Sequence, residues 1–365
     1  MGNSGKWSEN VTVRGVPDTR LATIGLLVLV LVVAGMIAWE LQMRSLGLVA
    51  GDLGDSKASW AVERRKVAVG AYDGVVIIGS SRILFDTNLD IWKEMTGRRP
   101  IQLAMTGTSP RPVLTDFAND PDFRGLLVVD VAPEGFFTEA RFHPDFAGVL
   151  DYWKEQSPSQ RFGHQVGLFL SRHLAFLDDQ YTLIALIDQL DLTNRGEIKR
   201  PYLVPWKLSE TYDDRQTWLW SQIKDNERLR QHAMRVWMST KRKPPDAELL
   251  ARIFEAARKD VGKIRARGGE VVFVRPPSVG FYHEREEKNT PRAKTWDRLL
   301  QETGAFGINF EDYPAMQGLE TPEMSHLSRE SAQRFTHAYV EVIMKGVPWL
   351  STQASQSSTR GESHG

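Results

Sequence analysis

The chain has 365 residues, of which 41% are hydrophobic, so it can bury one large core or two smaller ones and is neither a fibrous repeat nor a wholly disordered protein. Its 46 basic and 46 acidic residues cancel, so no overall charge favours nucleic acid and we expect no nucleic-acid partner. The absence of cysteine excludes disulfides, thiolate metal ligands and a cysteine nucleophile.

Near the N-terminus lies an uncharged apolar segment, LATIGLLVLVLVVAGMIAW, at residues 21–39. At the rise of an α-helix it matches the roughly 30 Å hydrocarbon core of a bilayer, so we predict one transmembrane helix over 21–40. A cleaved signal peptide is disfavoured because the segment is long and runs through Trp39 into Glu40 without a small-residue cleavage pattern. A buried core helix is disfavoured because no polar face interrupts the run.

The basic residues around this segment predict its orientation. Lys6, Arg14 and Arg20 precede it, whereas Arg44 alone follows closely. The positive-inside rule therefore predicts a cytoplasmic arm over 1–20 and a main domain outside the cytoplasm. In a Gram-negative cell this would be a single-pass protein of the inner membrane with a periplasmic domain.

The rest of the chain divides by composition. Residues 41–70 are predicted to be a juxtamembrane connector with some amphipathic helix, and residues 71–348 to be the folded domain. Residues 349–365 are predicted to be a disordered tail, because the stretch from Ser351 is small, polar and free of aromatic residues.

Within the folded domain, four apolar runs rich in β-branched residues predict buried strands, at 75–79, 100–105, 126–131 and 270–277. Segments with the spacing of amphipathic helices lie between the first and second runs, between the second and third, and before the fourth. This alternation favours a mainly parallel sheet covered by helices on both faces. Between the third and fourth strands, residues 150–245 contain long aromatic-rich segments with helical spacing, which predict a helical insertion.

In a parallel sheet, ligands bind outside the carboxyl ends of the strands, so the residues that follow each strand are the candidates for a site. Small, hydroxylated and basic residues collect there: Ser80, Ser81, Arg82, Thr106, Gly107, Thr108, Arg275 and Ser278. Glu323 and His326 occur in a loop just before an amphipathic C-terminal helix, with Ser328 as the expected N-cap.

These residue types can make an activated serine, which needs a base and donors for the developing oxyanion. Ser81 is the candidate nucleophile, His326 the base and Glu323 the acid that orients the imidazole. The amides of Ser81 and Gly107 are the candidate oxyanion donors.

Other interpretations of these residues stay open. Ser81 could simply cap the following helix, with Ser80 shaping the turn, and Glu311 and Asp312 are rival acids. Arg82 and Arg275 would either contact an anionic or carbonyl oxygen of a substrate or form structural ion pairs. The histidines show no metal-ligand spacing, so we expect neither a metal nor another cofactor.

Three pieces of this sequence, IGSSR at 78–82, LAMTGTSP at 103–110 and EMSHL at 323–327, resemble the SGNH hydrolases, also called GDSL esterases. The likeness spans about residues 75–335 and is greatest to membrane-anchored, extracytoplasmic SGNH-like proteins of bacterial acyl-transfer systems. It implies a three-layer, flavodoxin-like α/β sandwich with Ser81 as nucleophile, Gly107 in the oxyanion hole and His326 as base. It also implies an O-acyl (acetyl) esterase or transferase acting on a carbohydrate or envelope polysaccharide, often beside a membrane-bound O-acyltransferase.

The sequence departs from the family pattern at two places. Glu323 stands where the family usually has aspartate, and the third predicted strand continues as VVDVAPEGFF, without the family's oxyanion-donating asparagine. Loss of one such donor typically costs ~10²–10³ in rate, so Thr106, Thr108 or Arg275 would have to replace it. The alternative function is an inactive SGNH-like scaffold that binds polysaccharide or a membrane O-acyltransferase through the helical insertion.

Overall fold

The computed structural model describes residues 21–139, 146–182, 207–239 and 243–350, and the chain divides into two units, residues 1–49 and 50–365. The first unit contains α1 (Leu21–Ser45), whose mean hydropathy is 2.8 over a window that is not buried at all. This helix is long and apolar enough to cross a membrane, as an anchor or as a signal sequence. It extends five residues past the predicted end at residue 40, to Ser45. In this last turn Arg44 pairs with Glu40. The predicted arm over 1–20 lies outside the described residues.

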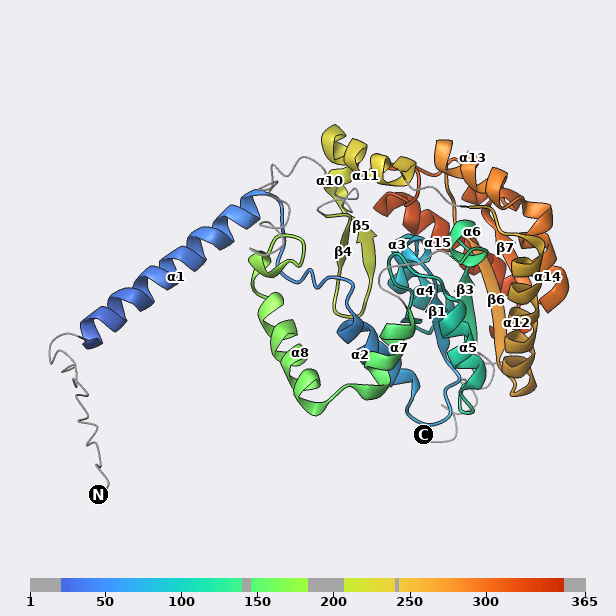
Figure 1. Cartoon of the computed structure of the whole chain (residues 1–365), viewed down its shortest axis with the longest axis horizontal. Coiled ribbons are helices and arrows are strands. Elements are labelled where there is room, and N and C mark those ends of the chain that lie inside the picture. The colour runs from blue at the N-terminus through green and yellow to red at the C-terminus, as the bar shows by residue number, and fades with distance from the viewer. Residues whose placement is uncertain (1–20, 140–145, 183–206, 240–242, 351–365) are drawn as a thin grey trace, which may run out of the picture. The chain divides into compact units, whose positions relative to one another are not determined.

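The second unit is built on a five-stranded sheet whose neighbouring strands are all parallel (Figure 1). The strand order is β2-β1-β3-β6-β7. Every residue of β1 and β3 is buried, which explains why these segments are apolar throughout rather than alternating. The mainly parallel sheet and its four predicted strands are confirmed. The strands are β1 (Val75–Ile78), β2 (Ile101–Gln102), β3 (Leu126–Asp130), β6 (Glu270–Arg275) and β7 (Phe306–Asn309).

Helices cover both faces of this sheet (Figure 1). Alternate strand residues, such as Val76 and Leu127, enter a core shared with one set of helices, while their neighbours Ile77 and Val128 point to the other face. The first set is α2 (Lys57–Val67), α5 (Arg111–Asn119), α7 (Phe146–Glu155), α12 (Ala247–Ala266) and α14 (Trp296–Thr303). The second set is α3 (Ser81–Asp86), α4 (Leu89–Thr96) and α15 (Arg329–Gly346).

Strand β7 was not predicted from the sequence. Its four residues, FGIN, are interrupted by Gly307 and lack a continuous apolar run. The glycine is required by close contact, because a Cβ at this position would lie 2.5 Å from Leu300 Cδ1 and 2.9 Å from the Trp296 ring of α14. Thus Gly307 lets α14 pack against β7, and it also interrupts the apolar run by which the strand could have been predicted.

The predicted connector over 41–70 contains a helix that belongs to the second unit. In α2, Trp60 is fully buried and its indole N–H donates to the Leu103 carbonyl at 2.8 Å. Arg64 of the same helix pairs with Asp116 and Asp120 at 3.0 and 2.8 Å. The second unit accordingly begins at residue 50 rather than near 71.

The predicted insertion over 150–245 is only partly helical. The antiparallel hairpin of β4 (Ser209–Thr211) and β5 (Thr217–Leu219) occupies part of the region whose spacing predicted helix. A tight turn with Arg215 at φ 63° joins the two strands and breaks the helical pattern. Residues 183–206 of the insertion, like the predicted tail beyond residue 350, lie outside the described residues. The helices described in the insertion are α8 (Pro158–Ser171), η1 (Ala175–Leu177), α10 (Ser221–Asp225) and α11 (Glu227–Ser239).

The remaining elements surround the carboxyl edge of the sheet or connect its last strands. They are α6 (Pro133–Phe136), α13 (Gly280–Asn289), η2 (Arg292–Lys294), η3 (Phe310–Asp312) and η4 (Pro314–Met316). Helix α13 contacts both α6 and α11, so part of the insertion reaches the edge where β1, β3 and β6 end.

Candidate active site

The turn between β1 and α3 presents Ser81 at the carboxyl edge of the sheet. Gly79 is obligatory there, because a Cβ on it would lie 2.3 Å from Asp130 Cβ and 2.5 Å from Ile83 Cγ2. Ser80 is buried, and its amide and hydroxyl both donate to Asp130 Oδ2, at 2.8 and 2.5 Å. Ser80 therefore fixes the turn, and the half-buried Ser81 begins the helix.

Asp130, the last residue of β3, ties this turn to the neighbouring strand. Burial raises the pKa of its carboxyl, although the two hydrogen bonds from Ser80 act in the opposite direction. Its other oxygen, Oδ1, is buried and has no hydrogen-bond partner among the described residues. Asp130 is thus a structural anchor beneath the serine.

His326 lies between Ser81 and Glu323. Its Nε2 is 2.8 Å from Ser81 Oγ and its Nδ1 is 2.8 Å from Glu323 Oε1. A carboxylate only accepts hydrogen bonds, so the shared proton resides on Nδ1 and the Nε2 lone pair faces the serine hydroxyl. Both His326 and Glu323 are fully buried, and the Phe85 ring lies 4.5 Å from the imidazole centroid. In this arrangement the imidazole can accept the proton of Ser81.

The loop that carries Glu323 folds back on itself to reach the histidine. Glu323 Oε1 also accepts the His326 amide at 2.6 Å, and Met324 between them has a left-handed φ of 75°. A non-glycine residue in this conformation costs roughly 1–3 kcal/mol and is kept where its surroundings determine it. Here the Met324 carbonyl accepts the Val279 amide at 3.1 Å. The extra methylene of glutamate is accommodated by this turn, and Ser328 caps α15 just beyond it as predicted.

Gly107 lies beside the serine turn in a loop whose shape is fixed from two sides. The Met105 amide donates to the Gly79 carbonyl at 3.0 Å, which places the loop against the turn, and Gly107 has a φ of 65°. Asp55 Oδ2 accepts both the amide and the hydroxyl of Thr106, at 2.6 and 2.7 Å. Within the described residues the amides of Gly107 and Ser81 donate to no protein group, so both are open to a ligand.

The other side chains predicted to contact a substrate already have partners. The Thr106 hydroxyl donates a hydrogen bond to Asp55, and the buried Thr108 hydroxyl donates to the Met105 carbonyl at 2.6 Å. Arg275 is 1% exposed and pairs with Glu287 at 2.6 Å. The structure therefore does not offer Thr106, Thr108 or Arg275 as a replacement for the family's asparagine.

Arg82, which follows the serine, forms a buried ion pair. Its Nη2 lies 2.5 Å from Glu286 Oε1, and its guanidinium lies 4.8 Å from the centre of the Tyr282 ring. Burial opposes the charge of Arg82, but Glu286 and the nearby acidic groups outweigh burial and raise its pKa. The structural ion pair, one of the two interpretations of Arg82 from the sequence, is the one observed.

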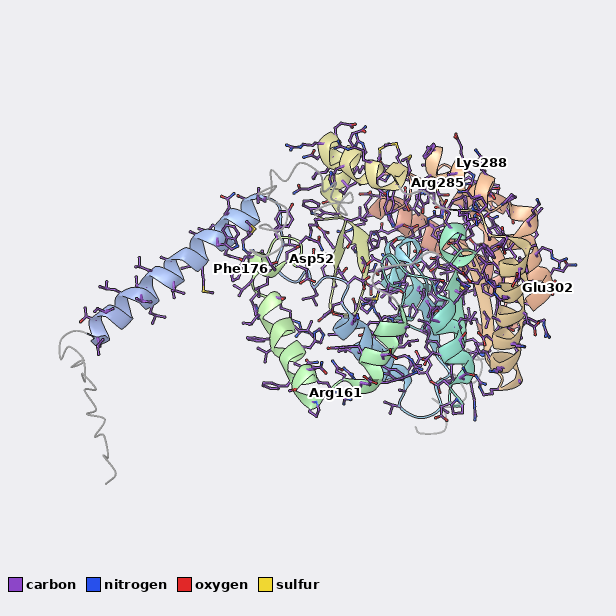
Figure 2. All side chains as sticks on the ribbon, in the orientation of Figure 1. Asp52, Arg161, Phe176, Arg285, Lys288 and Glu302 are labelled. Atoms are coloured by element: carbon purple, nitrogen blue, oxygen red, sulfur yellow. The ribbon has the colours of Figure 1, made fainter. Side chains whose placement is uncertain are left out.

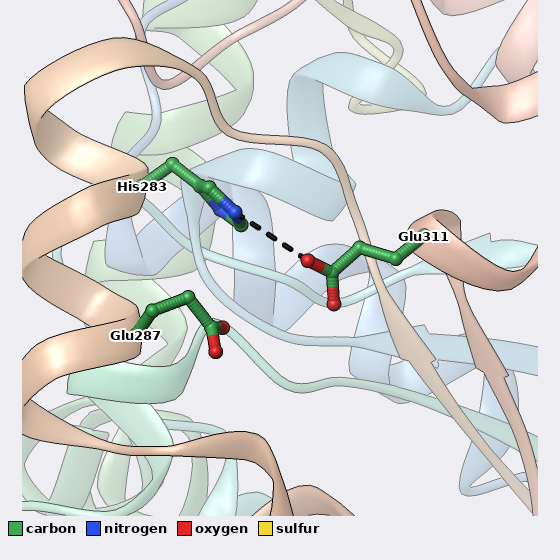
Figure 3. Close-up of side chains that lie close together, drawn as sticks. All are labelled: His283, Glu287 and Glu311. Atoms are coloured by element: carbon green, nitrogen blue, oxygen red, sulfur yellow. Dashed lines mark ion pairs between the residues drawn. The ribbon is translucent and has the colours of Figure 1, made fainter.

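A second serine, histidine and glutamate occur together at the end of β6. Ser278 Oγ lies 3.1 Å from His283 Nδ1, and His283 Nε2 lies 3.4 Å from Glu311 Oε1. Figure 3 shows His283 and Glu311 with Glu287. Each of the three offers one atom of the kind that binds metal ions, a ring nitrogen or a carboxylate oxygen, and these atoms all lie within 4.8 Å of one another. Arg275 contacts both glutamates, at 2.6 and 3.4 Å, and supplies the positive charge that these carboxylates need.

The rival acids predicted from the sequence are bonded elsewhere. Glu311 belongs to this second group, and Asp312 forms a fork with Arg292 at 2.7 and 2.8 Å. Glu323 is therefore the acid bonded to His326.

Several residues that shape the site carried no signal in the sequence. Asp55 comes from the segment predicted to be a connector, and Trp237 of α11 donates its indole N–H to Glu323 Oε2 across 86 positions of sequence. Glu134, which follows β3 where the family has its asparagine block, forms a fork with Arg285 at 3.0 and 2.9 Å. The sequence predicted aromatic-rich helix in this region, but its spacing did not indicate that Trp237 would donate to Glu323.

No protein-family model matches this chain, and no curated protein or solved structure matches it either. The resemblance to SGNH hydrolases therefore depends on the three short motifs quoted above.

Proposed function

We propose that this protein is an SGNH-like serine enzyme, an O-acyl esterase or transferase on a flavodoxin-like α/β domain. The observation that carries the proposal is the hydrogen-bonded chain from Ser81 through His326 to Glu323, with both distances at 2.8 Å. Numbered along the chain, the five sheet strands have the order 2-1-3-4-5, the order of flavodoxin-like folds. Ser81 follows β1 at the point where that order reverses, which is where such folds bind ligands.

In the proposed reaction Ser81 Oγ attacks the acyl carbonyl carbon while His326 Nε2 takes the hydroxyl proton. The carbonyl oxygen becomes an oxyanion, which the amides of Ser81 and Gly107 stabilise. The intermediate collapses to an acyl-serine, and the leaving alcohol receives the proton from His326. Water or a second hydroxyl group then attacks the acyl-serine by the same route, giving hydrolysis or transfer.

The substrate and the location follow from the resemblance rather than from the geometry. We propose that the acyl group is an acetyl ester on a carbohydrate or envelope polysaccharide. We also propose that α1 anchors the domain to the inner membrane on its periplasmic side, where a membrane-bound O-acyltransferase is a possible partner. The length and apolar character of α1 support the anchoring, and the basic residues that precede it support the orientation.

The second candidate function, a non-catalytic scaffold, is favoured by one observation. Among the described residues the oxyanion site has only backbone donors, because Thr106, Thr108 and Arg275 are engaged and the region after β3 holds Glu134 in a salt bridge with Arg285. A site short of one donor is typically slower by ~10²–10³. On this account the domain would bind a polysaccharide or an acyltransferase and would not itself catalyse acyl transfer or hydrolysis.

An aryl acetate assay on the full-length chain in detergent separates the two functions. The enzyme account predicts turnover by the wild type and by Ser278→Ala, a matched control because Ser278 also contacts a histidine. Ser81→Ala should reduce turnover to the uncatalysed background. Equal turnover in wild type and Ser81→Ala would contradict the enzyme account. If, in addition, Ser81→Ala restored polysaccharide modification in a deletion strain, the scaffold account would replace it.

A further inference from the structure

The two carboxylate oxygens of Glu323 have different partners. Oε1 accepts both the His326 amide and the His326 Nδ1 proton, at 2.6 and 2.8 Å. Oε2 accepts the indole N–H of Trp237, the only donor to this oxygen among the described residues. Because Glu323 is fully buried, an oxygen without this donor would be desolvated and unpaired.

Trp237 belongs to the insertion rather than to the sheet or its covering helices. Its ring also packs against the site, with its centroid 5.7 Å from the His326 imidazole and 5.9 Å from the Tyr282 ring. One residue of α11 therefore contacts the base through its ring and the acid through its N–H.

A second contact holds α11 in place. The Trp237 carbonyl accepts a hydrogen bond from Arg285 of α13, whose guanidinium also forms the fork with Glu134 of α6. Arg285 lies at the junction of α11 and α13 (Figure 2). The buried Glu134 of α6 thus holds the arginine that binds the backbone of α11 at Trp237.

The chemistry of glutamate explains why such a partner is needed. Glutamate has one more rotatable bond than the aspartate usual in this position, so a carboxylate held at Oε1 alone can rotate and lose its alignment with Nδ1. A donor at Oε2 removes that freedom, and hydrogen bonds to charged groups are among the strongest in proteins.

We propose that Trp237 is a positioning residue that locks the Glu323 carboxylate against His326, so that α11 of the insertion completes the active site. This proposal deepens the serine-enzyme function proposed above and rests on it. The Glu134–Arg285 pair holds α11 in the position where Trp237 can act.

The test uses Trp237→Phe in the full-length chain in detergent, because phenylalanine keeps an aromatic ring beside His326 and removes the N–H donor together with one ring of the indole. Trp60→Phe is the matched control, since it removes an indole hydrogen bond to the Leu103 carbonyl in the core. We expect kcat for an aryl acetate to fall about 10- to 100-fold in Trp237→Phe with KM unchanged, the loss expected for one hydrogen bond to a charged group. Trp60→Phe should keep the wild-type kcat.

A spectroscopic measurement tests the positioning without relying on turnover. In protein labelled with ¹⁵N-histidine, the Nδ1 proton of His326, assigned by its loss in His326→Gln, should shift or broaden in Trp237→Phe and stay unchanged in Trp60→Phe. If Trp237→Phe does not fold, Arg285→Gln, which frees α11, should produce the same change to a smaller extent.

The outcomes separate this inference from the proposed function. An unchanged Nδ1 resonance and an unchanged kcat in folded Trp237→Phe would overturn the positioning role. A raised KM at constant kcat would also overturn it, because Trp237 would then bind substrate instead. A shifted resonance in a protein whose wild type shows no turnover would support the positioning role while rejecting the enzyme.

Discussion

The molecule contains two groups of serine, histidine and glutamate, and they differ in the direction of their hydrogen bonds. In the first group, His326 Nδ1 donates to Glu323 and Nε2 accepts from Ser81. In the second group, the Ser278 hydroxyl donates its proton to Glu286 at 2.8 Å, so His283 Nδ1 has to donate to Ser278. The histidine of the second group therefore cannot take the proton of its serine.

Access and charge separate the two groups further. Ser278 is 2% exposed, whereas Ser81 is half-buried at the edge of the sheet. Among the described residues, Glu323 accepts hydrogen bonds from the Trp237 indole and from His326 but pairs with no arginine or lysine, whereas Glu311 is shared with the cations Arg275 and Arg292. A serine, a histidine and a glutamate in contact therefore do not define a nucleophile by themselves; the direction of the hydrogen bonds and the exposure of the serine are also needed.

The largest expected effect comes from removing the histidine of the first group. His326→Gln should reduce the aryl acetate kcat by roughly 10⁴- to 10⁶-fold, because Ser81 loses its base. His283→Gln, the matched change in the second group, should leave kcat unchanged. Similar losses in both variants would remove the distinction between the groups.

The next effect concerns the two acids. Glu323→Gln keeps the shape of the side chain but removes the charge that fixes the Nδ1 proton, so kcat should fall by roughly 10³- to 10⁴-fold. Glu311→Gln should retain wild-type turnover. A retained kcat in Glu323→Gln would show that the buried acid does not orient the base.

A smaller effect is expected at the oxyanion loop. Gly107→Ala forces a side chain into a left-handed conformation at φ 65°, which costs roughly 1–2 kcal/mol and displaces the amide, so kcat should fall by up to about 10²-fold. Gly97→Ala imposes the same strain at φ 74° after α4, away from Ser81. Thermal unfolding should report similar destabilisation of both variants, and the kinetics should distinguish them. Equal kcat values would exclude the Gly107 amide as a donor.

The smallest effect is on stability alone and concerns Asp86, which anchors the His326 loop through the Leu327 amide at 2.9 Å. Burial raises the pKa of this carboxyl well above 3.8. Because the folded state then binds the proton more tightly than the unfolded state, stability falls as pH rises from about 4 toward the folded pKa. Asp86→Asn keeps the acceptor and cannot ionise, so its unfolding free energy relative to wild type should increase over that window by ~1.4 kcal/mol per pH unit. A constant difference in chemical denaturation between pH 4 and 8 would contradict this.

The sheet was largely predictable because its strands are apolar along their whole length. The parallel-sheet rule then placed Ser81 and Gly107 at one edge, and the structure brings them together there with His326. The hairpin of β4 and β5 was not predicted, because the sequence of β5, Thr217–Leu219, continues into a segment with helical spacing. The turn at Arg215, which joins the two strands, gave no clear break in that pattern.

The partners of the site residues could not be predicted, because they come from distant segments. Asp55 engages Thr106 from outside the predicted domain, and the donor to Glu323 comes from the insertion. The engagement of Arg275 depends on Glu287 and Glu311, which lie on two other elements. Such contacts depend on tertiary structure, which local sequence patterns do not encode.

The most direct test of the central claim is to locate the serine that reacts with a fluorophosphonate. The full-length chain would be treated with the reagent, digested and analysed by mass spectrometry. The account predicts a phosphonyl adduct on the peptide containing Ser81, none on the peptide containing Ser278, and no adduct in His326→Gln. An adduct on Ser278, or a wild-type chain that stays unmodified, would contradict it.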